Sequence, residues 1–175
     1  MKQASVKRLV GCGLIAAVYV VLSVALAPVS FGGLQFRVSE ALTLLPVFSP
    51  YAIIGVTLGC FLSNVAGAVM GLTPPLDILF GTAATLLAAL CTWALRSIRF
   101  RTIPLAAAVP PIVLNAVIIG WEIAFFFLPG TAFWPGFWAS ALGVGAGQTA
   151  ACGILGLLLV AALERTGADR LLREL

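Results

Sequence analysis

Charge is scarce in this chain of 175 residues, since 9% of its residues are charged and soluble domains carry ~25%. Hydrophobic residues make up 62% of the chain, and the mean hydropathy is +1.15. A chain this short has too little interior to bury so many apolar side chains, because the buried fraction of the surface rises only slowly with size. The shortage of charge excludes an ordinary soluble domain and predicts an integral membrane protein.

Histidine is absent, which removes the usual proton shuttle and the commonest metal ligand. The four cysteines, Cys12, Cys60, Cys91 and Cys152, lie singly in apolar runs without CxxC spacing, so packing is favoured over disulfide or zinc roles. The net charge of +4 comes without the interleaved aromatics of a nucleic-acid surface. We therefore expect no metal, no cofactor and no nucleic-acid partner.

A helix needs about 20 apolar residues to cross a bilayer. The first apolar run, residues 9–27, is too long for the apolar region of a signal peptide. Further apolar runs follow it, so we interpret it as a retained membrane helix. The second run, residues 38–48, is short for a helix that crosses the bilayer. The chain is predicted to be all-α, a single membrane domain over residues 1–175. Its six expected spans are residues 9–27, 38–48, 51–72, 76–95, 103–128 and 138–162.

Basic residues give an independent test of this topology, because Lys and Arg gather in cytoplasmic loops. Nine of the ten form three clusters: Lys2, Lys7 and Arg8; Arg96, Arg99 and Arg101; Arg165, Arg170 and Arg173. With six spans and a cytoplasmic N-terminus, all nine fall inside and Arg37 alone falls outside. Both termini are therefore predicted to be cytoplasmic, and the short second run is counted as a span.

Polar residues in the spans are the candidate site. Each ionisable group in a membrane costs at least ~2.5–3.5 kcal/mol on insertion scales, so such groups seldom lack a purpose. The predicted topology puts the four charged ones in the outer half of the bilayer. The candidates are Arg37, Glu40, Asp77 and Glu122, with the amides Asn64, Asn115 and Gln148.

Structural roles compete with binding at most of these positions. Arg37 and Glu40 are three residues apart and could pair with each other. Asp77 could cap its helix, and each amide could form an interhelical hydrogen bond. Glu122 has no basic residue in its own helix and lies among apolar residues, and an unpaired buried carboxylate is costly. A ligand or a distant partner such as Arg37 is favoured for Glu122.

An aromatic, proline-containing stretch, LPGTAFWPGFW, is predicted to be the loop before the last span. Its aromatic residues fit the aromatic belt that many membrane proteins place at the interface. They also fit a hydrophobic lid over an outward-facing pocket. Trp138, at the end of the stretch, is included among the candidate binding residues.

Two segments carry a resemblance to a known family. FGGLQFRVSEALTLLPVFSPYAIIGVTLGCFLSN and the later PPLDILFGTAATLLAAL are similar to the queuosine-precursor transporter family, whose members are the substrate-binding S components of energy-coupling factor (ECF) transporters. The likeness runs from Ala16 to about Leu159. It implies a protein of the bacterial cell membrane that captures a solute outside and then topples in the bilayer.

The resemblance also implies partners. An S component works on an ECF module, made of a membrane T subunit and two cytoplasmic ATPases, and this chain has no P-loop pattern of its own. Close helix packing inside a bilayer requires small residues. The family's docking motif lies in the first helix, which assigns partner docking to Gly13, Ala16 and Ala17.

The solutes of the family are 7-deazaguanines (preQ1, preQ0 or queuine). Glu122 or Glu40 would accept hydrogen bonds from the guanine-like edge, and Asn64, Asn115 and Gln148 would read the rest of the ligand. A cationic aminomethyl arm would require a further acid such as Asp77. The resemblance implies that many members of the family have an acid where this chain has Gly147 and Gln148, so the neutral side chain of Gln148 leaves the nitrile form and queuine open.

Three alternatives remain at this point. The chain could be an S component for another vitamin or heterocycle, because a fold alone does not determine its ligand. It could be an autonomous channel or secondary transporter, although no internal repeat and no polar path through the inner half support that. A membrane enzyme using Glu40, Asp77 and Glu122 as acid and base is disfavoured, because histidine, a metal cluster and a nucleophile motif are all missing.

Overall fold

The computed structural model describes residues 2–30, 36–128 and 132–175, which fold into helices. The α-helices are α1 (Lys2–Ala25), α2 (Ala27–Ser30), α3 (Tyr51–Val69), α4 (Asp77–Ala94), α5 (Leu105–Glu122), α6 (Phe133–Gln148), α7 (Leu157–Thr166) and α8 (Asp169–Arg173); η1 (Val38–Val47) is a 3₁₀-helix, and η2 (Ile123–Phe127) and η3 (Thr149–Gly156) are π-helical.

Five helical segments are long and apolar enough to cross a bilayer. They are Val6–Ala25, Tyr51–Val69, Asp77–Ala94, Leu105–Phe127 and Phe133–Thr166. The prediction of an all-α membrane protein is confirmed. The second expected span, residues 38–48, is the helix η1, which is apolar but only ten residues long.

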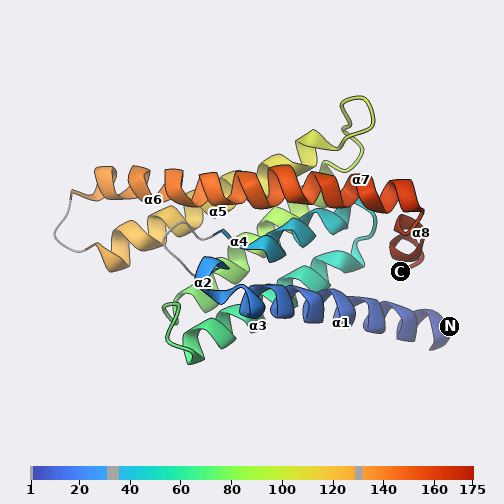
Figure 1. Cartoon of the computed structure of the whole chain (residues 1–175), viewed down its shortest axis with the longest axis horizontal. Coiled ribbons are helices and arrows are strands. Elements are labelled where there is room, and N and C mark those ends of the chain that lie inside the picture. The colour runs from blue at the N-terminus through green and yellow to red at the C-terminus, as the bar shows by residue number, and fades with distance from the viewer. Residues whose placement is uncertain (1, 31–35, 129–131) are drawn as a thin grey trace.

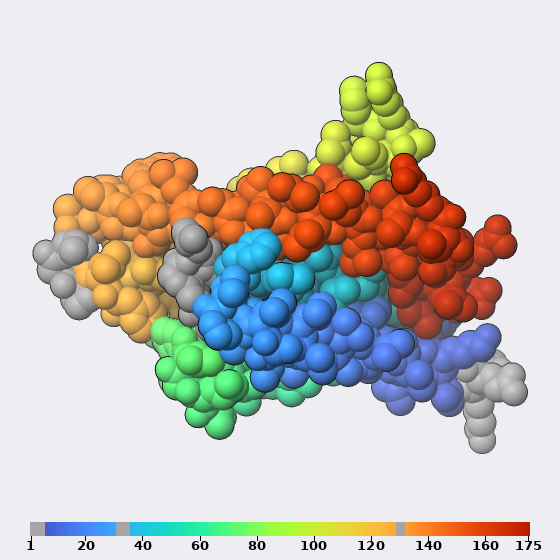
Figure 2. All heavy atoms as spheres, in the orientation of Figure 1, coloured from blue at the N-terminus to red at the C-terminus, as the bar shows by residue number. Residues whose placement is uncertain are grey.

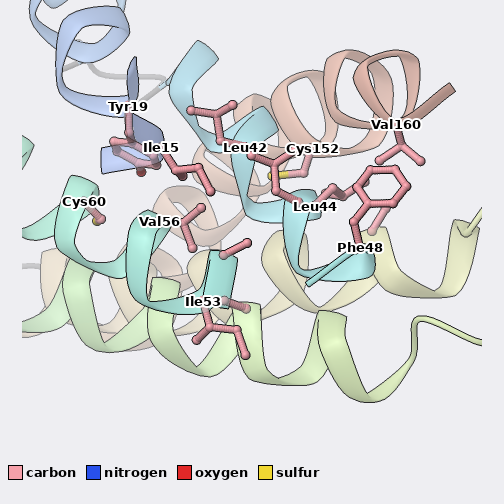
Figure 3. Packing of buried hydrophobic residues seen from close by; sticks show 14 residues of the cluster. Ile15, Tyr19, Leu42, Leu44, Phe48, Ile53, Val56, Cys60, Cys152 and Val160 are labelled. Carbon is pink, nitrogen blue, oxygen red and sulfur yellow. The ribbon is translucent and has the colours of Figure 1, made fainter. Parts of the chain in front are cut away.

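The short helix η1 lies at the centre of the bundle rather than on its surface. Residues 39–47 are all buried, and η1 packs against α1, α3, α4, α7 and η3. Its side chains Leu42 and Leu44 meet Val56 and Val160 in the main hydrophobic core (Figure 3). At ~2.0 Å per residue, a 3₁₀-helix of ten residues is about 20 Å long, so η1 reaches across only part of the ~30 Å hydrocarbon core.

Both chain termini lie at one end of the bundle (Figure 1), which we call the terminal end, and the opposite end is the distal end. The three basic clusters are also found at the terminal end, where Arg99 of one cluster bonds Glu164 beside another at 2.7 Å. Arg37 immediately precedes η1, which begins on the side of the bundle that faces away from the termini (Figure 1). Nine basic residues at one end are the charge distribution that the sequence predicted.

Helix α6 begins earlier than the expected sixth span. The aromatic residues from Phe133 to Trp138 form its first turns instead of a loop. Pro135 is tolerated there because the first N–H groups of a helix have no intrahelical partner. Through η3 and α7 the helical path runs unbroken to Thr166, and its distal part, with that of α5, projects beyond α1 and α3 (Figure 2).

Two glycines of α3 bring it against α1. A Cβ added at Gly59 would lie 2.6 Å from the Cβ of Tyr19, and one at Gly55 would lie 2.9 Å from the Cβ of Ile15. Small residues four apart allow membrane helices to approach closely. The contact positions Tyr19, whose hydroxyl belongs to the polar cluster described below.

We expect Gly59→Val to destabilise the fold by about 1–3 kcal/mol, because overpacking a filled contact displaces backbone and side chains. Thermal unfolding in detergent would measure the change. Gly143→Val is the matched control, since nothing lies within 4 Å of a Cβ at Gly143. Equal effects of the two substitutions would contradict the close α1–α3 contact.

Candidate ligand-binding site

Arg37 connects three elements through its buried guanidinium group. Its Nη1 donates to Oδ1 of Asn64 in α3 at 2.8 Å, and its Nη2 lies 3.7 Å from Oδ2 of Asp77 in α4. The Arg37 side chain is 6% exposed. A buried guanidinium requires charged or polar partners, and here those partners come from helices that the chain reaches much later.

Asn64 holds the start of α4 against α3. Its Nδ2 donates to the main-chain oxygen of Asp77 at 2.9 Å, while its Oδ1 accepts from Arg37. A Cβ at Gly81 would lie 2.7 Å from that Nδ2, so the glycine makes room for the amide. Asp77 is the first residue of α4, and its carboxyl group faces Arg37.

Glu40 is held by a residue that sequence reasoning missed. The hydroxyl of Tyr19 in α1 donates to Oε1 of Glu40 at 2.6 Å, and both residues are buried. Within the described residues, the other oxygen, Oε2, has no hydrogen-bond partner. Arg37 and Glu40, three residues apart, thus have different bonded partners, and the carboxylate keeps one oxygen available to a ligand.

Glu122 ends α5 and is 0% exposed. Its carboxyl group is close enough to that of Asp77 for the two to interact. Neither of its oxygens has a hydrogen-bond partner in the part of the chain that the structure describes. A carboxylate in this environment requires a proton, a cation or a ligand to satisfy it.

The remaining candidates do not join this polar cluster of Arg37, Glu40, Asn64, Asp77 and Glu122. Asn115 donates to the carbonyl of Pro111 in its own helix at 2.9 Å. Gln148 accepts from the thiol of Cys152 one turn along at 3.2 Å. Both amides are buried, and neither forms an interhelical bond, which was one alternative, to any residue that the structure describes.

Trp138 lies away from the cluster, with 59% of its surface exposed. It lines an apolar groove of about 490 Å³ between α5 and α6. A second apolar groove, of about 460 Å³, lies between α4, α5 and α6 and includes Phe80 and Trp121. Since Phe80 is one turn from Asp77 and Trp121 precedes Glu122, this second groove borders the helices that carry the acids.

The three residues that were expected to dock a partner differ in their exposure. Gly13 and Ala17 are exposed on α1, and a Cβ at Gly13 would meet nothing within 4 Å. Ala16 is buried, with its Cα 3.1 Å from where a Cβ of Gly59 would stand. Gly13 and Ala17 are thus free to contact another molecule, whereas Ala16 packs within the bundle.

Sequence reasoning missed Tyr19, Cys60 and Thr85. Thr85 donates to the sulfur of Cys60 at 3.2 Å, and Asn64 donates to the same sulfur at 3.5 Å. Tyr19 could have been identified from its position among the apolar residues of the first span. A hydroxyl group buried in the membrane needs a hydrogen-bond acceptor. No comparable signal marks Cys60 or Thr85, which are ordinary residues of apolar helices.

Comparison with known proteins shows which family the chain belongs to. A family model described as "QueT transporter" matches residues 9–165. This chain belongs to the QueT transporter family. The match covers both segments that carried the resemblance in the sequence, which is thereby confirmed, and it makes the chain a multi-pass protein of a bacterial cell membrane.

A curated relative supports the same family. The chain is 41% identical over 66 residues to the queuosine precursor transporter QueT of Lactococcus lactis subsp. cremoris (strain MG1363). The matched region is 37% of this chain and 39% of that relative. No solved structure matches the chain significantly. The description of the family model names a transporter.

Proposed function

We propose that this chain is the substrate-binding S component of an ECF importer and captures a 7-deazaguanine queuosine precursor from outside the cell. The observation that carries the proposal is Glu122, a buried carboxylate with two unsatisfied oxygens beside Asp77 and Arg37. Such a group is costly unless a proton, a cation or a ligand satisfies it, and the L. lactis relative bears the name of a queuosine precursor transporter.

The donors and acceptors of the polar cluster suit a guanine-like ligand. The edge of guanine carries adjacent N–H donors, and carboxylate oxygens accept them. Carboxylate oxygens that accept no hydrogen bond from a described residue are present on Glu122 and on Glu40. The apolar groove beside α4 and α5 offers Phe80 and Trp121, and flat bases stack on aromatic side chains.

The position of the cluster suits capture from outside. Nine basic residues at the terminal end favour a cytoplasmic location for that end, which turns the distal end, with Arg37 and Asp77, to the outside. The exposed small residues Gly13 and Ala17 lie near the middle of α1, which begins at the terminal end (Figure 1). They would contact the T subunit of an ECF module, whose ATPases would supply the energy.

Mass spectrometry of whatever co-purifies with the chain tests the proposal most directly. The protein would be purified in mild detergent from bacteria that make queuosine, and its bound small molecules would be extracted and identified. We expect a 7-deazaguanine in near-stoichiometric amount. A bound flavin, thiamine or other vitamin would contradict the assigned ligand while leaving the S-component role, and uptake of precursor by the chain without any ATPase would contradict that role.

A further inference from the structure

We propose that the hairpin between α4 and α5, residues 95–104, binds an anionic phospholipid at the membrane surface of the terminal end. The guanidinium group of Arg101 would hold the lipid phosphate, and the exposed ring of Phe100 would enter the layer of acyl chains beside it. The inference goes beyond the proposed function, because it involves neither the polar cluster nor a transport partner.

The hairpin is held at the membrane surface by its short length. It joins two candidate membrane spans, Asp77–Ala94 and Leu105–Phe127, so that only residues 95–104 lie between them. Figure 1 and Figure 2 show this segment projecting sideways from the bundle, on the far side of α7 from α1. A bundle that crosses the bilayer along its long axis therefore places this hairpin over the lipid beside the protein.

The hairpin has a defined conformation. Phe100 and Ile103 form an antiparallel bridge and exchange two main-chain hydrogen bonds of 3.0 and 3.1 Å. Nη1 of Arg99 donates to the main-chain oxygen of Thr102 at 3.0 Å and to Oε1 of Glu164 in α7 at 2.7 Å. A loop that is already ordered loses less conformational entropy when it binds a ligand.

Arg101, at the turn of the hairpin, has an unfavourable backbone conformation. Among the described residues it is the one non-glycine residue with a positive φ, at 56°. A residue with a β-carbon adopts this left-handed conformation at a cost that glycine avoids. Backbone strain of this kind is concentrated at functional sites. We infer that the arginine side chain at this turn has a use that outweighs the strain.

The three arginines of the hairpin differ in their partners. Arg99 is paired with Glu164. Arg96 lies over the ring of Trp93 at 3.6 Å and donates to the main-chain oxygen of that residue at 2.8 Å. Arg101 is exposed, and its side chain forms no hydrogen bond or ion pair with any described residue. The hairpin contains no acidic residue, and a guanidinium group binds phosphate through several donors at once.

Apolar side chains surround this unpaired charge. Phe100 is 67% exposed, and Ile98 and Ile103 are exposed as well. Segments that bind a membrane surface combine apolar side chains, which enter the acyl region, with basic residues, which attract anionic headgroups. The hairpin has both kinds of side chain at the level of the headgroups, which favours a lipid over a protein as its partner.

Native mass spectrometry of the purified full chain tests the inference, because it resolves the species that carries one bound lipid. Dioleoyl phosphatidylglycerol and dioleoyl phosphatidylcholine share their acyl chains and differ in headgroup charge. We expect the anionic lipid to bind at least about 5-fold more tightly. Arg101→Gln should weaken its binding by about 5-fold, the contribution of one basic residue near a membrane surface. Arg101→Lys should retain most of the affinity.

Three further variants separate charge, apolar contact and backbone strain. Arg170→Gln removes an exposed basic residue of α8 at the same end of the bundle, and it should change the affinity for the anionic lipid by less than about 2-fold. Phe100→Ser should weaken both lipids, because the ring contacts the acyl chains that they share. Arg101→Gly should weaken the anionic lipid without lowering the unfolding temperature in detergent, because glycine adopts the positive φ freely.

Equal affinities of the wild-type chain for the two lipids would overturn the inference. So would an equal loss in Arg101→Gln and Arg170→Gln, which would show a general attraction to the basic end of the bundle. Unchanged lipid binding by Arg101→Gln, together with lost association with a cytoplasmic protein, would assign the hairpin to that protein instead. The wild-type ratio decides the question even if a variant fails to fold.

Discussion

Replacing Arg37 with methionine is expected to cost about 3–5 kcal/mol of folding stability, the largest loss predicted for a single substitution in this chain. Removing one partner of a buried ion pair leaves the other charge uncompensated. Here three buried carboxyl groups would remain without a cation, and Asn64 would lose the donor to its Oδ1. Chemical denaturation in detergent micelles, followed by tryptophan fluorescence, would measure the loss.

The double variant Arg37→Met with Asp77→Asn should recover part of this loss, because it removes the carboxylate nearest to the missing guanidinium. Arg99→Met is the matched control. Its ion pair with Glu164 is partly exposed, and pairs of that kind contribute less than about 1 kcal/mol. A cost for Arg37→Met no larger than that for Arg99→Met would contradict the buried network.

Gly13→Leu is expected to abolish ATP-driven uptake of the ligand while leaving its binding unchanged, which is the second large effect. The substitution introduces no clash within the chain, since a Cβ at Gly13 meets nothing within 4 Å. The added side chain would instead prevent the close helix approach on which association in a bilayer depends. Uptake of radiolabelled precursor by cells containing the ECF module, with binding to the purified chain, would separate the two activities.

The matched control is Gly143→Leu, a second glycine with open space around it, placed on α6 away from the exposed face of α1. It should leave both uptake and binding intact. Normal uptake by Gly13→Leu would remove the docking role from this face of α1. Loss of ligand binding by the same variant would show that the substitution disturbs the fold and not the contact with a partner.

The all-α membrane architecture was predictable because it depends on local properties of the chain. Each long apolar run is itself the evidence for a helix in lipid, and the basic clusters record which loops lie together. Boundaries were less predictable. Helix α6 takes in Phe133 and Pro135, because a proline in the first turn of a helix removes no intrahelical hydrogen bond.

The sequence predicted most of the residues of the candidate site, but it did not predict which side chains those residues contact. Rarity in an apolar chain was enough to mark Arg37, Glu40, Asn64, Asp77 and Glu122, and the structure brings these five together. The same rarity also marked Asn115 and Gln148, which bond within their own helical segments. The rarity of polar residues in an apolar chain identifies groups that are costly to bury. It does not say which neighbouring group forms a hydrogen bond or an ion pair with each of them.

The sequence alone determined that this protein lies in lipid, that its helices are arranged with nine basic residues at one end, and which few polar groups are candidates for function. Hydropathy and loop charge act locally and can be read in order along the chain. Only the tertiary structure decided that Tyr19 holds Glu40, that Arg37 faces Asp77, and that Glu122 is left unsatisfied. Those contacts join residues from different helices, and their distances depend on how close-packed helices such as α1 and α3 approach each other.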